Sequence, residues 1–83
     1  PTFVVDAYAY RLFERLGHPP GPRRYDVYRE YFMRMIGTTP EDVWALNEWH
    51  ALIVRHGQQT CRKTQPRCGD CALLDRCAFG RTQ

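Results

Sequence analysis

The sequence predicts an all-α fold whose last part is a cysteine-rich loop. Apolar residues recur at helical spacing in residues 1–57, and no stretch of the chain alternates convincingly as a β-strand would. All four cysteines fall in residues 58–83, where Pro66 and Gly69 interrupt any sustained apolar period. We therefore expect three main helices in residues 1–57, followed by a segment that a ligand organises in residues 58–83.

The first two helices are predicted from two apolar stripes that each end at a glycine. The first stripe ends at Gly17, and the proline-rich residues 18–22 cannot continue a helix. Asp6 is a favoured N-cap residue for the helix that carries Ala9, Leu12 and Leu16. The second stripe ends at Gly37. The two sets of apolar residues are Val5, Ala9, Leu12, Phe13 and Leu16, and then Tyr25, Tyr28, Phe32, Met35 and Ile36.

The third helix has the clearest start signal in the chain. Thr39 is a suitable N-cap, Pro40 suits the first helical position, and Asp42 lies where it can complete a capping box. Gly57 is the expected stop. The predicted core face consists of Val43, Leu46, His50, Ile53 and Val54. Helical spacing likewise makes most of five aromatic residues packing residues rather than base-stacking ones: Tyr25, Tyr28, Tyr31, Trp44 and Trp49.

The charge is unevenly distributed along the 83 residues. Residues 1–54 carry six arginines and seven acidic side chains, whereas residues 55–83 carry six basic and two acidic ones, within a net charge of +3. A basic C-terminal third favours a polyanionic partner. The sequence contains no run long enough to cross a membrane and no signal peptide, so we expect an intracellular protein, in the cytoplasm or nucleoid if the host is prokaryotic.

The spacing of the cysteines, Cys-x6-Cys-x2-Cys-x5-Cys, leaves three interpretations open. Two disulfides would enclose only short loops, and nothing marks the chain for secretion. A structural zinc site usually draws its thiolates from two Cys-x2-Cys pairs, and this chain has one such pair. An iron–sulfur cluster is wider than one ion and suits uneven gaps, so the spacing favours it over zinc. The four candidate ligands are Cys61, Cys68, Cys71 and Cys77.

The same cysteine pattern resembles the [4Fe-4S] signature of the endonuclease III family of DNA glycosylases. His56-Gly57-Gln58-Gln59-Thr60-Cys61 is similar to the run that enters this cluster, and Val4-Val5-Asp6-Ala7-Tyr8 is similar to the stretch that holds the family's catalytic aspartate. The matches lie at both ends of the chain and in the expected order. The resemblance implies part of a two-domain helical glycosylase that removes a damaged or mismatched base from double-stranded DNA.

The resemblance assigns a role to three sets of residues. Asp6 is the implied catalytic carboxylate, which stabilises positive charge on the deoxyribose and deprotonates the attacking group. The four cysteines are the implied ligands of a [4Fe-4S] cluster, with zinc as the alternative. Arg62, Lys63 and Arg67 are the implied contacts to DNA phosphates, although they also offset the negative charge of a four-thiolate cluster.

The sequence departs from the family's pattern in two respects. No glycine-rich hairpin precedes Asp6, and the sole lysine, Lys63, does not match the position of the Schiff-base lysine that members with lyase activity use. Tyr8 stands where the best-known members have histidine. We therefore expect these residues to be a C-terminal part of a glycosylase that does not excise a base alone.

Two further expectations follow from this incompleteness. An apolar surface that includes Val4 and Val5 should remain uncovered and allow self-association. The rival hypothesis is a non-enzymatic zinc or iron–sulfur module that binds nucleic acid or a protein.

Overall fold

The computed structural model describes residues 2–83 and confirms the all-α prediction, with no β-strand among these residues. It contains helices α1 (Ala7–Leu16), α2 (Tyr25–Ile36) and α3 (Val43–Gln59). A single 3₁₀ turn, η1 (Pro40–Asp42), precedes α3, and three more follow it: η2 (Cys68–Asp70), η3 (Leu74–Arg76) and η4 (Gly80–Thr82). The short turns replace regular structure in the cysteine-rich part, as expected of a ligand-organised segment.

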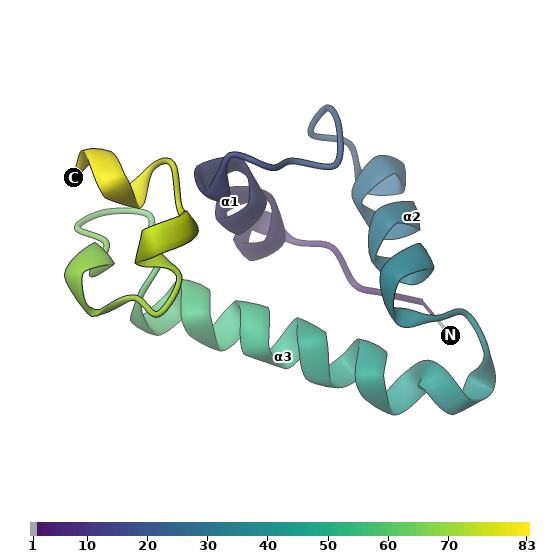
Figure 1. Ribbon diagram of the computed structural model, residues 1–83. Helices are drawn as coiled ribbons and strands as arrows, with labels where there is room; N and C mark the ends of the chain where they lie inside the picture. Colours follow the sequence, from purple (N-terminus) through teal and green to yellow (C-terminus); the bar gives the residue numbers. More distant parts are fainter. Residues whose placement is uncertain (1) are drawn as a thin grey trace.

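The helices form an elongated arrangement along α3 (Figure 1). α1 lies over the C-terminal half of α3 and α2 over its N-terminal half, on the same side of it. The cysteine-rich segment folds at the C-terminal end of α3 beside α1, and the molecule measures 40 × 24 × 20 Å. Helix α1 therefore connects the core near the N-terminus with the cysteine-rich end.

Local sequence signals set most helix ends. Asp6 caps α1, and Gly17 closes it in the left-handed conformation with a φ of 90°. Gly37 follows α2 with a φ of 142°, and a Cβ there would collide with the Asp42 side chain. Before α3, the Asp42 carboxylate accepts hydrogen bonds from the Thr39 backbone N–H at 3.0 Å and from its hydroxyl at 2.9 Å, and these bonds lower the Asp42 pKa.

The core is built around Phe3, which is fully buried. Its ring stacks on that of Phe32 with centroids 4.2 Å apart, and its backbone N–H contacts the Met33 sulfur at 3.2 Å. Burying such a ring contributes roughly 2 kcal/mol, so the extended residues before α1 help to join α1, α2 and α3. The buried apolar set is Phe3, Val5, Ala9, Tyr28, Phe32, Met33, Leu46 and Ile53.

The structure corrects the predicted core faces of α2 and α3. Met33 is buried, whereas Met35 is 67% exposed, so the core face of α2 is rotated from the predicted stripe. Met35 is a member of the predicted stripe, and Met33 directly follows another member, Phe32. Helical periodicity alone therefore did not identify which methionine is buried. On α3, Val43 is exposed. Of the five aromatic residues expected mostly to pack, three are exposed: Tyr25, Trp44 and Trp49.

Gly57 does not end the third helix, because α3 continues to Gln59. Gly57 is buried, and a Cβ at this position would lie 2.3 Å from Cδ1 of Tyr8. The glycine is required where α1 crosses α3 closely, and the sequence signal for a helix stop was in fact a signal for close packing.

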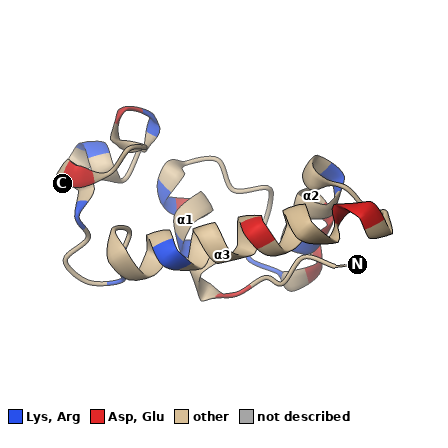
Figure 2. Cartoon of the chain, turned by 90° about the horizontal axis from the view of Figure 1, so that it is seen from below, with Lys and Arg blue, Asp and Glu red and all other residues tan. Residues whose placement is uncertain are grey.

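Figure 2 shows how the charged residues are distributed over the fold. Acidic residues lie in η1, just before α3, whereas basic segments lie in the C-terminal half of α3 and, together with acidic ones, in the cysteine-rich end. Within residues 2–83, no helix is both long and apolar enough to cross a bilayer.

Candidate metal centre and catalytic carboxylate

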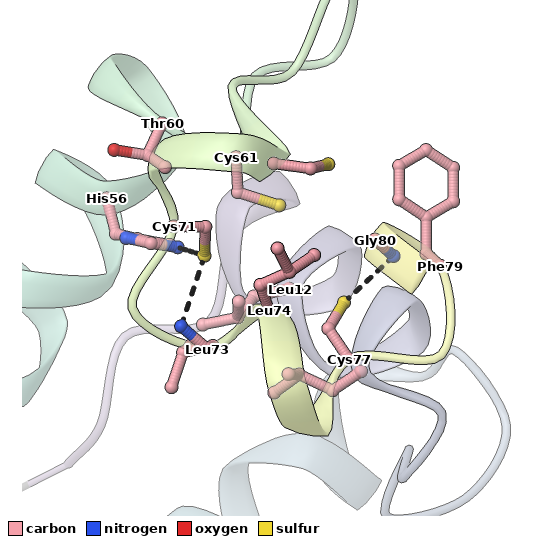
Figure 3. A pocket seen from close by; sticks show the side chains of 12 residues that line it. Leu12, His56, Thr60, Cys61, Cys71, Leu73, Leu74, Cys77, Phe79 and Gly80 are labelled. Atoms are coloured by element: carbon pink, nitrogen blue, oxygen red, sulfur yellow. Dashed lines mark hydrogen bonds between the residues drawn. The ribbon is translucent and has the colours of Figure 1, made fainter. Parts of the chain in front are cut away.

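The four cysteines line one pocket at the junction of α1, α3 and the cysteine-rich segment (Figure 3). About 330 Å³ beside these residues is not filled by protein atoms, a volume that includes space open to solvent. Leucine side chains from α1 and the cysteine-rich segment form much of its wall. All four thiols are free, so the disulfide alternative is absent from the structure. The lining residues are Leu12, Leu16, His56, Thr60, Cys61, Cys68, Cys71, Leu73, Leu74, Cys77, Phe79 and Gly80.

Backbone N–H groups are directed at two of the sulfurs. The Leu73 N–H lies 3.4 Å from Cys71 Sγ, and the Gly80 N–H lies 3.3 Å from Cys77 Sγ. Such donors stabilise the thiolate form, which is the form that binds metal. Gly80 is buried, and a Cβ there would lie 3.1 Å from the Leu74 side chain, so the turn after Cys77 is closely packed.

Two arginines of α1 attach the cysteine-rich segment to the helices. The Arg11 guanidinium donates to the carbonyls of Gly57 at 3.1 Å and Cys61 at 3.0 Å, at the end of α3. Arg15 donates to the carbonyls of Arg62 at 2.7 Å and Lys63 at 3.1 Å, and its Nη1 lies 3.6 Å from Cys61 Sγ. These two residues were not predicted as part of the site. Their spacing of four on one helix, beside the apolar stripe, is the signal that could have indicated them.

Arg15 also contacts the other end of the segment. Its carbonyl oxygen accepts from the Phe79 N–H at 2.9 Å and from the Cys77 thiol at 3.3 Å, and its guanidinium lies 4.3 Å from the centre of the Phe79 ring. One residue of α1 thus holds the chain near the first cysteine and near the last.

His56 lies in the last turn of α3, as expected, but its ring faces the pocket. Nε2 lies 3.6 Å from Cys71 Sγ, and burial lowers the pKa of this histidine. A neutral imidazole is therefore favoured beside the sulfur.

The donor set fits a sulfur-bound group that spans the pocket. Within residues 2–83, no three side chains of the His, Cys, Asp or Glu types are grouped as the ligands of one metal ion would be. The four cysteines nevertheless surround a common space with largely apolar walls. A wider inorganic group with one thiolate per metal is compatible with both observations.

Asp6 lies at the opposite end of α1 from this pocket. Its Oδ1 accepts from the backbone N–H groups of Tyr8 at 3.1 Å and Ala9 at 3.3 Å, so the N-cap interpretation is confirmed. Its Oδ2 lies 3.0 Å from Nε2 of His50 on α3. The first α1 residue to line the pocket is Leu12, six residues after Asp6, so the carboxylate lies roughly 9 Å from the edge of the pocket along the helix axis.

The three basic residues of the loop after Cys61 differ in their surroundings. The Arg62 guanidinium donates to the Gln65 carbonyl at 2.7 Å and shapes the loop, which a bond from the Arg67 N–H to the Thr60 carbonyl closes at 2.8 Å. Lys63 and Arg67 are exposed. Their side chains are free of the packing that holds Arg62.

The fold thus places a capped aspartate at one end of α1 and a four-thiol pocket at the other, the two features that the sequence resemblance to cluster-bearing DNA glycosylases implied. The chain is 40% identical over 76 residues to the protein named "Putative DNA repair glycosylase" of Methanocaldococcus jannaschii, a match that covers 92% of this chain and 33% of that protein. It is 31% identical over 77 residues to endonuclease III of Sulfolobus acidocaldarius (93% and 32%). To endonuclease III of Escherichia coli it is 28% identical over 79 residues (95% and 35%).

These matches cover about nine-tenths of the chain and support its assignment as a fragment of an endonuclease III family protein. It spans about one third of the length of these curated relatives. No protein-family model matches it.

Proposed function

We propose that the chain is part of a base-excision-repair glycosylase, which at full length cleaves the N-glycosidic bond of a damaged or mismatched base in double-stranded DNA. The main support for this proposal is the similarity to endonuclease III and DNA repair glycosylase proteins over some nine-tenths of the chain. The chain itself carries an aspartate at the start of α1 and four free cysteines at one pocket.

In this proposal Asp6 is the catalytic carboxylate. The bond between C1′ of the deoxyribose and the base nitrogen breaks, and the base departs with the electron pair. Asp6 stabilises the positive charge on the sugar and accepts the proton that the attacking water loses as it bonds to C1′. The N-cap bonds support this role, because the first-turn N–H groups hold the carboxylate in place and a helix N-terminus favours a negative group.

A lyase step requires an amine nucleophile. The one lysine of the sequence, Lys63, lies in the loop after Cys61, some distance along the chain from Asp6. In a full-length protein with lyase activity, we expect a residue outside these 83 to supply the amine.

The glycosylase proposal is tested by replacing Asp6 with asparagine in the full-length protein. Asparagine keeps an oxygen for the N-cap but cannot accept a proton, so we expect the single-turnover rate on duplexes with single lesions to fall by about 10³-fold or more while folding is kept. As a control for folding, the far-ultraviolet circular dichroism spectrum of the variant should match that of the wild type. A variant that still excises the base at the wild-type rate would contradict the proposal and favour the non-enzymatic module.

We assign the four cysteines to a [4Fe-4S] cluster, which when bound supplies a rigid cross-link between the end of α3 and the C-terminal residues. The N–H groups directed at Cys71 and Cys77 favour bound thiolates. The absence of a grouping suited to one ion within residues 2–83 favours a cluster over zinc. Anaerobic purification with iron, sulfide and zinc analysis tests this assignment. We expect about four irons and four sulfides per chain; one zinc and no sulfide would contradict it.

Lys63 and Arg67, with Arg62 beside them, are the proposed contacts to DNA phosphates. Both are exposed on a loop that is closed at its base, so their charges project from a fixed position. Contacts of this kind strengthen binding without reading sequence and weaken as salt rises.

The proposed partner of the remaining exposed apolar surface is protein. A groove between α1, α2 and α3 encloses about 1090 Å³ of unfilled space, open to solvent. Met35 and Trp49, which are 67% and 53% exposed, are part of its lining. Val4 is exposed as expected, but Val5 is buried and does not contribute to such a surface. We propose that this groove is covered by other parts of a full-length glycosylase, and by a second copy when these residues are isolated.

A further inference from the structure

The Asp6 carboxylate is held from two different helices. One oxygen, Oδ1, is bound by the N–H groups of Tyr8 and Ala9 in its own helix. The other, Oδ2, lies 3.0 Å from His50 Nε2 in the middle of α3. The N-cap bonds alone fix one oxygen, whereas two anchors on two oxygens define the plane of the carboxylate.

The position of the His50 ring is itself set by the core. Its ring meets the Phe3 ring edge to face, with centroids 6.1 Å apart and an interplanar angle of 87°. Phe3 is fully buried and stacked on Phe32, so it cannot move without disturbing the core. His50 therefore presents Nε2 to Asp6 from a rigid support.

The contact with His50 limits how many acceptor positions of the carboxylate stay available to other groups. An ionised carboxylate has about four lone-pair positions. The two N–H groups of α1 occupy the two positions on Oδ1, and His50 occupies one position on Oδ2 when its proton is on Nε2. One position on Oδ2 is then left, and both side chains are 32% exposed, so the pair is accessible from the surface.

We propose that His50 is a positioning residue for Asp6. Its Nε2–H donates to Oδ2 and directs the last free lone pair of the carboxylate toward the reacting sugar and water. The inference rests on the proposed catalytic role of Asp6 and adds a residue that the cysteine and aspartate motifs do not include. Exact placement of a catalytic carboxylate matters because a displacement of about 1 Å can cost up to about 100-fold in rate.

The activity test compares three variants of the full-length protein. His50→Leu removes the donor and should lower kcat by about 10- to 100-fold, with KM changed less than about 3-fold. His50→Gln places an amide N–H near the position of Nε2 and should restore kcat to within about 5-fold of the wild type. Glu48→Leu is the matched control, because it replaces an exposed polar residue of the same helix by leucine, and it should leave kcat unchanged.

A spectroscopic test is independent of activity. In the wild-type chain with its metal centre loaded, imidazole ¹H–¹⁵N NMR spectra should show His50 protonated at Nε2, with a proton that exchanges slowly with water. In Asp6→Asn the amide oxygen remains at the N-cap and the NH₂ group faces His50. The imidazole must then accept at Nε2 and carry its proton on Nδ1. The Nδ1 resonance should therefore become that of a protonated nitrogen, and the Nε2 resonance that of an unprotonated one.

The outcomes separate this inference from the proposed function. An active Asp6→Asn variant would overturn the catalytic role of Asp6 itself. An inactive Asp6→Asn variant together with a fully active His50→Leu variant would overturn only the role of His50. If His50→Leu does not fold, His50→Gln decides: a folded variant with kcat reduced about 100-fold, or no tautomer change in the NMR comparison, would contradict the inference.

Discussion

Gly57 shows how a single missing side chain determines the crossing of two helices. In an exposed helix interior, replacing glycine with alanine stabilises by roughly 1 kcal/mol. Here the added Cβ would lie 2.3, 3.1 and 3.2 Å from three ring atoms of Tyr8. These atoms belong to a ring packed between α1 and α3, so they cannot withdraw as the end of a flexible chain could.

We therefore expect Gly57→Ala to lower the free energy of unfolding by about 1–3 kcal/mol, measured by chemical denaturation with the metal centre loaded. Gly69→Ala is the matched control, because a Cβ there meets no atom within 4 Å, and it should change stability by no more than about 0.5 kcal/mol. Combining Gly57→Ala with Tyr8→Ala should cost less than the sum of the two single changes. If the free-energy changes of the two single variants simply add in the double variant, the contact with Tyr8 is not the cause of the destabilisation by Gly57→Ala.

At the scale of elements, α1 is the link between the two candidate sites. Asp6 is at its N-terminus, and Arg15 in its last turn holds the cysteine-rich segment at the Arg62, Lys63 and Phe79 positions. That segment has little regular structure of its own, so bonds from α1 replace the packing that a longer helix would provide.

Arg15→Leu should loosen both ends of the cysteine-rich segment. The loss of charge-assisted bonds to two carbonyls corresponds to about 2 kcal/mol, and we expect hydrogen exchange of the amides at Cys61–Lys63 and Phe79 to accelerate by about 10-fold or more. The visible absorption of the loaded centre should also decay faster under a chelator. Arg55→Leu, an exposed arginine of α3, is the control. Equal exchange in the two variants would contradict a clamping role for Arg15.

At the scale of the whole molecule, the core is small and lies on one side of α3, which leaves the groove between the three helices open. Apolar surfaces of this kind are rarely left uncovered in soluble proteins. The groove continues along α3, because a second hollow shares Leu12, Trp49, Ile53 and Leu73 with it.

We expect the isolated 83 residues to self-associate through this groove. Sedimentation velocity between about 5 and 200 μM should show a concentration-dependent rise in mass, and Trp49→Glu should reduce it. Trp44→Glu is the matched control, since Trp44 is 74% exposed on the same helix but does not line the groove. A wild-type chain that stays monomeric throughout this range would contradict the proposal.

The sequence by itself determined the three helices, the ends of the first two at Gly17 and Gly37, the capping box at Thr39 and the grouping of all four cysteines in one segment. These features depend on local signals: apolar periodicity, N-cap chemistry and the spacing of ligands. The structure confirmed the all-α class and the role of Asp6 as an N-cap.

Only the tertiary structure decided which neighbour each face meets. Met33 rather than Met35 is buried, Gly57 marks a helix crossing rather than a helix end, and His50 reaches Asp6 across 44 positions of sequence. Arg15 contacts Cys61 across 46 positions. Contacts of this length depend on how the helices rotate and cross as they pack, and helical periodicity specifies a face without specifying its partner.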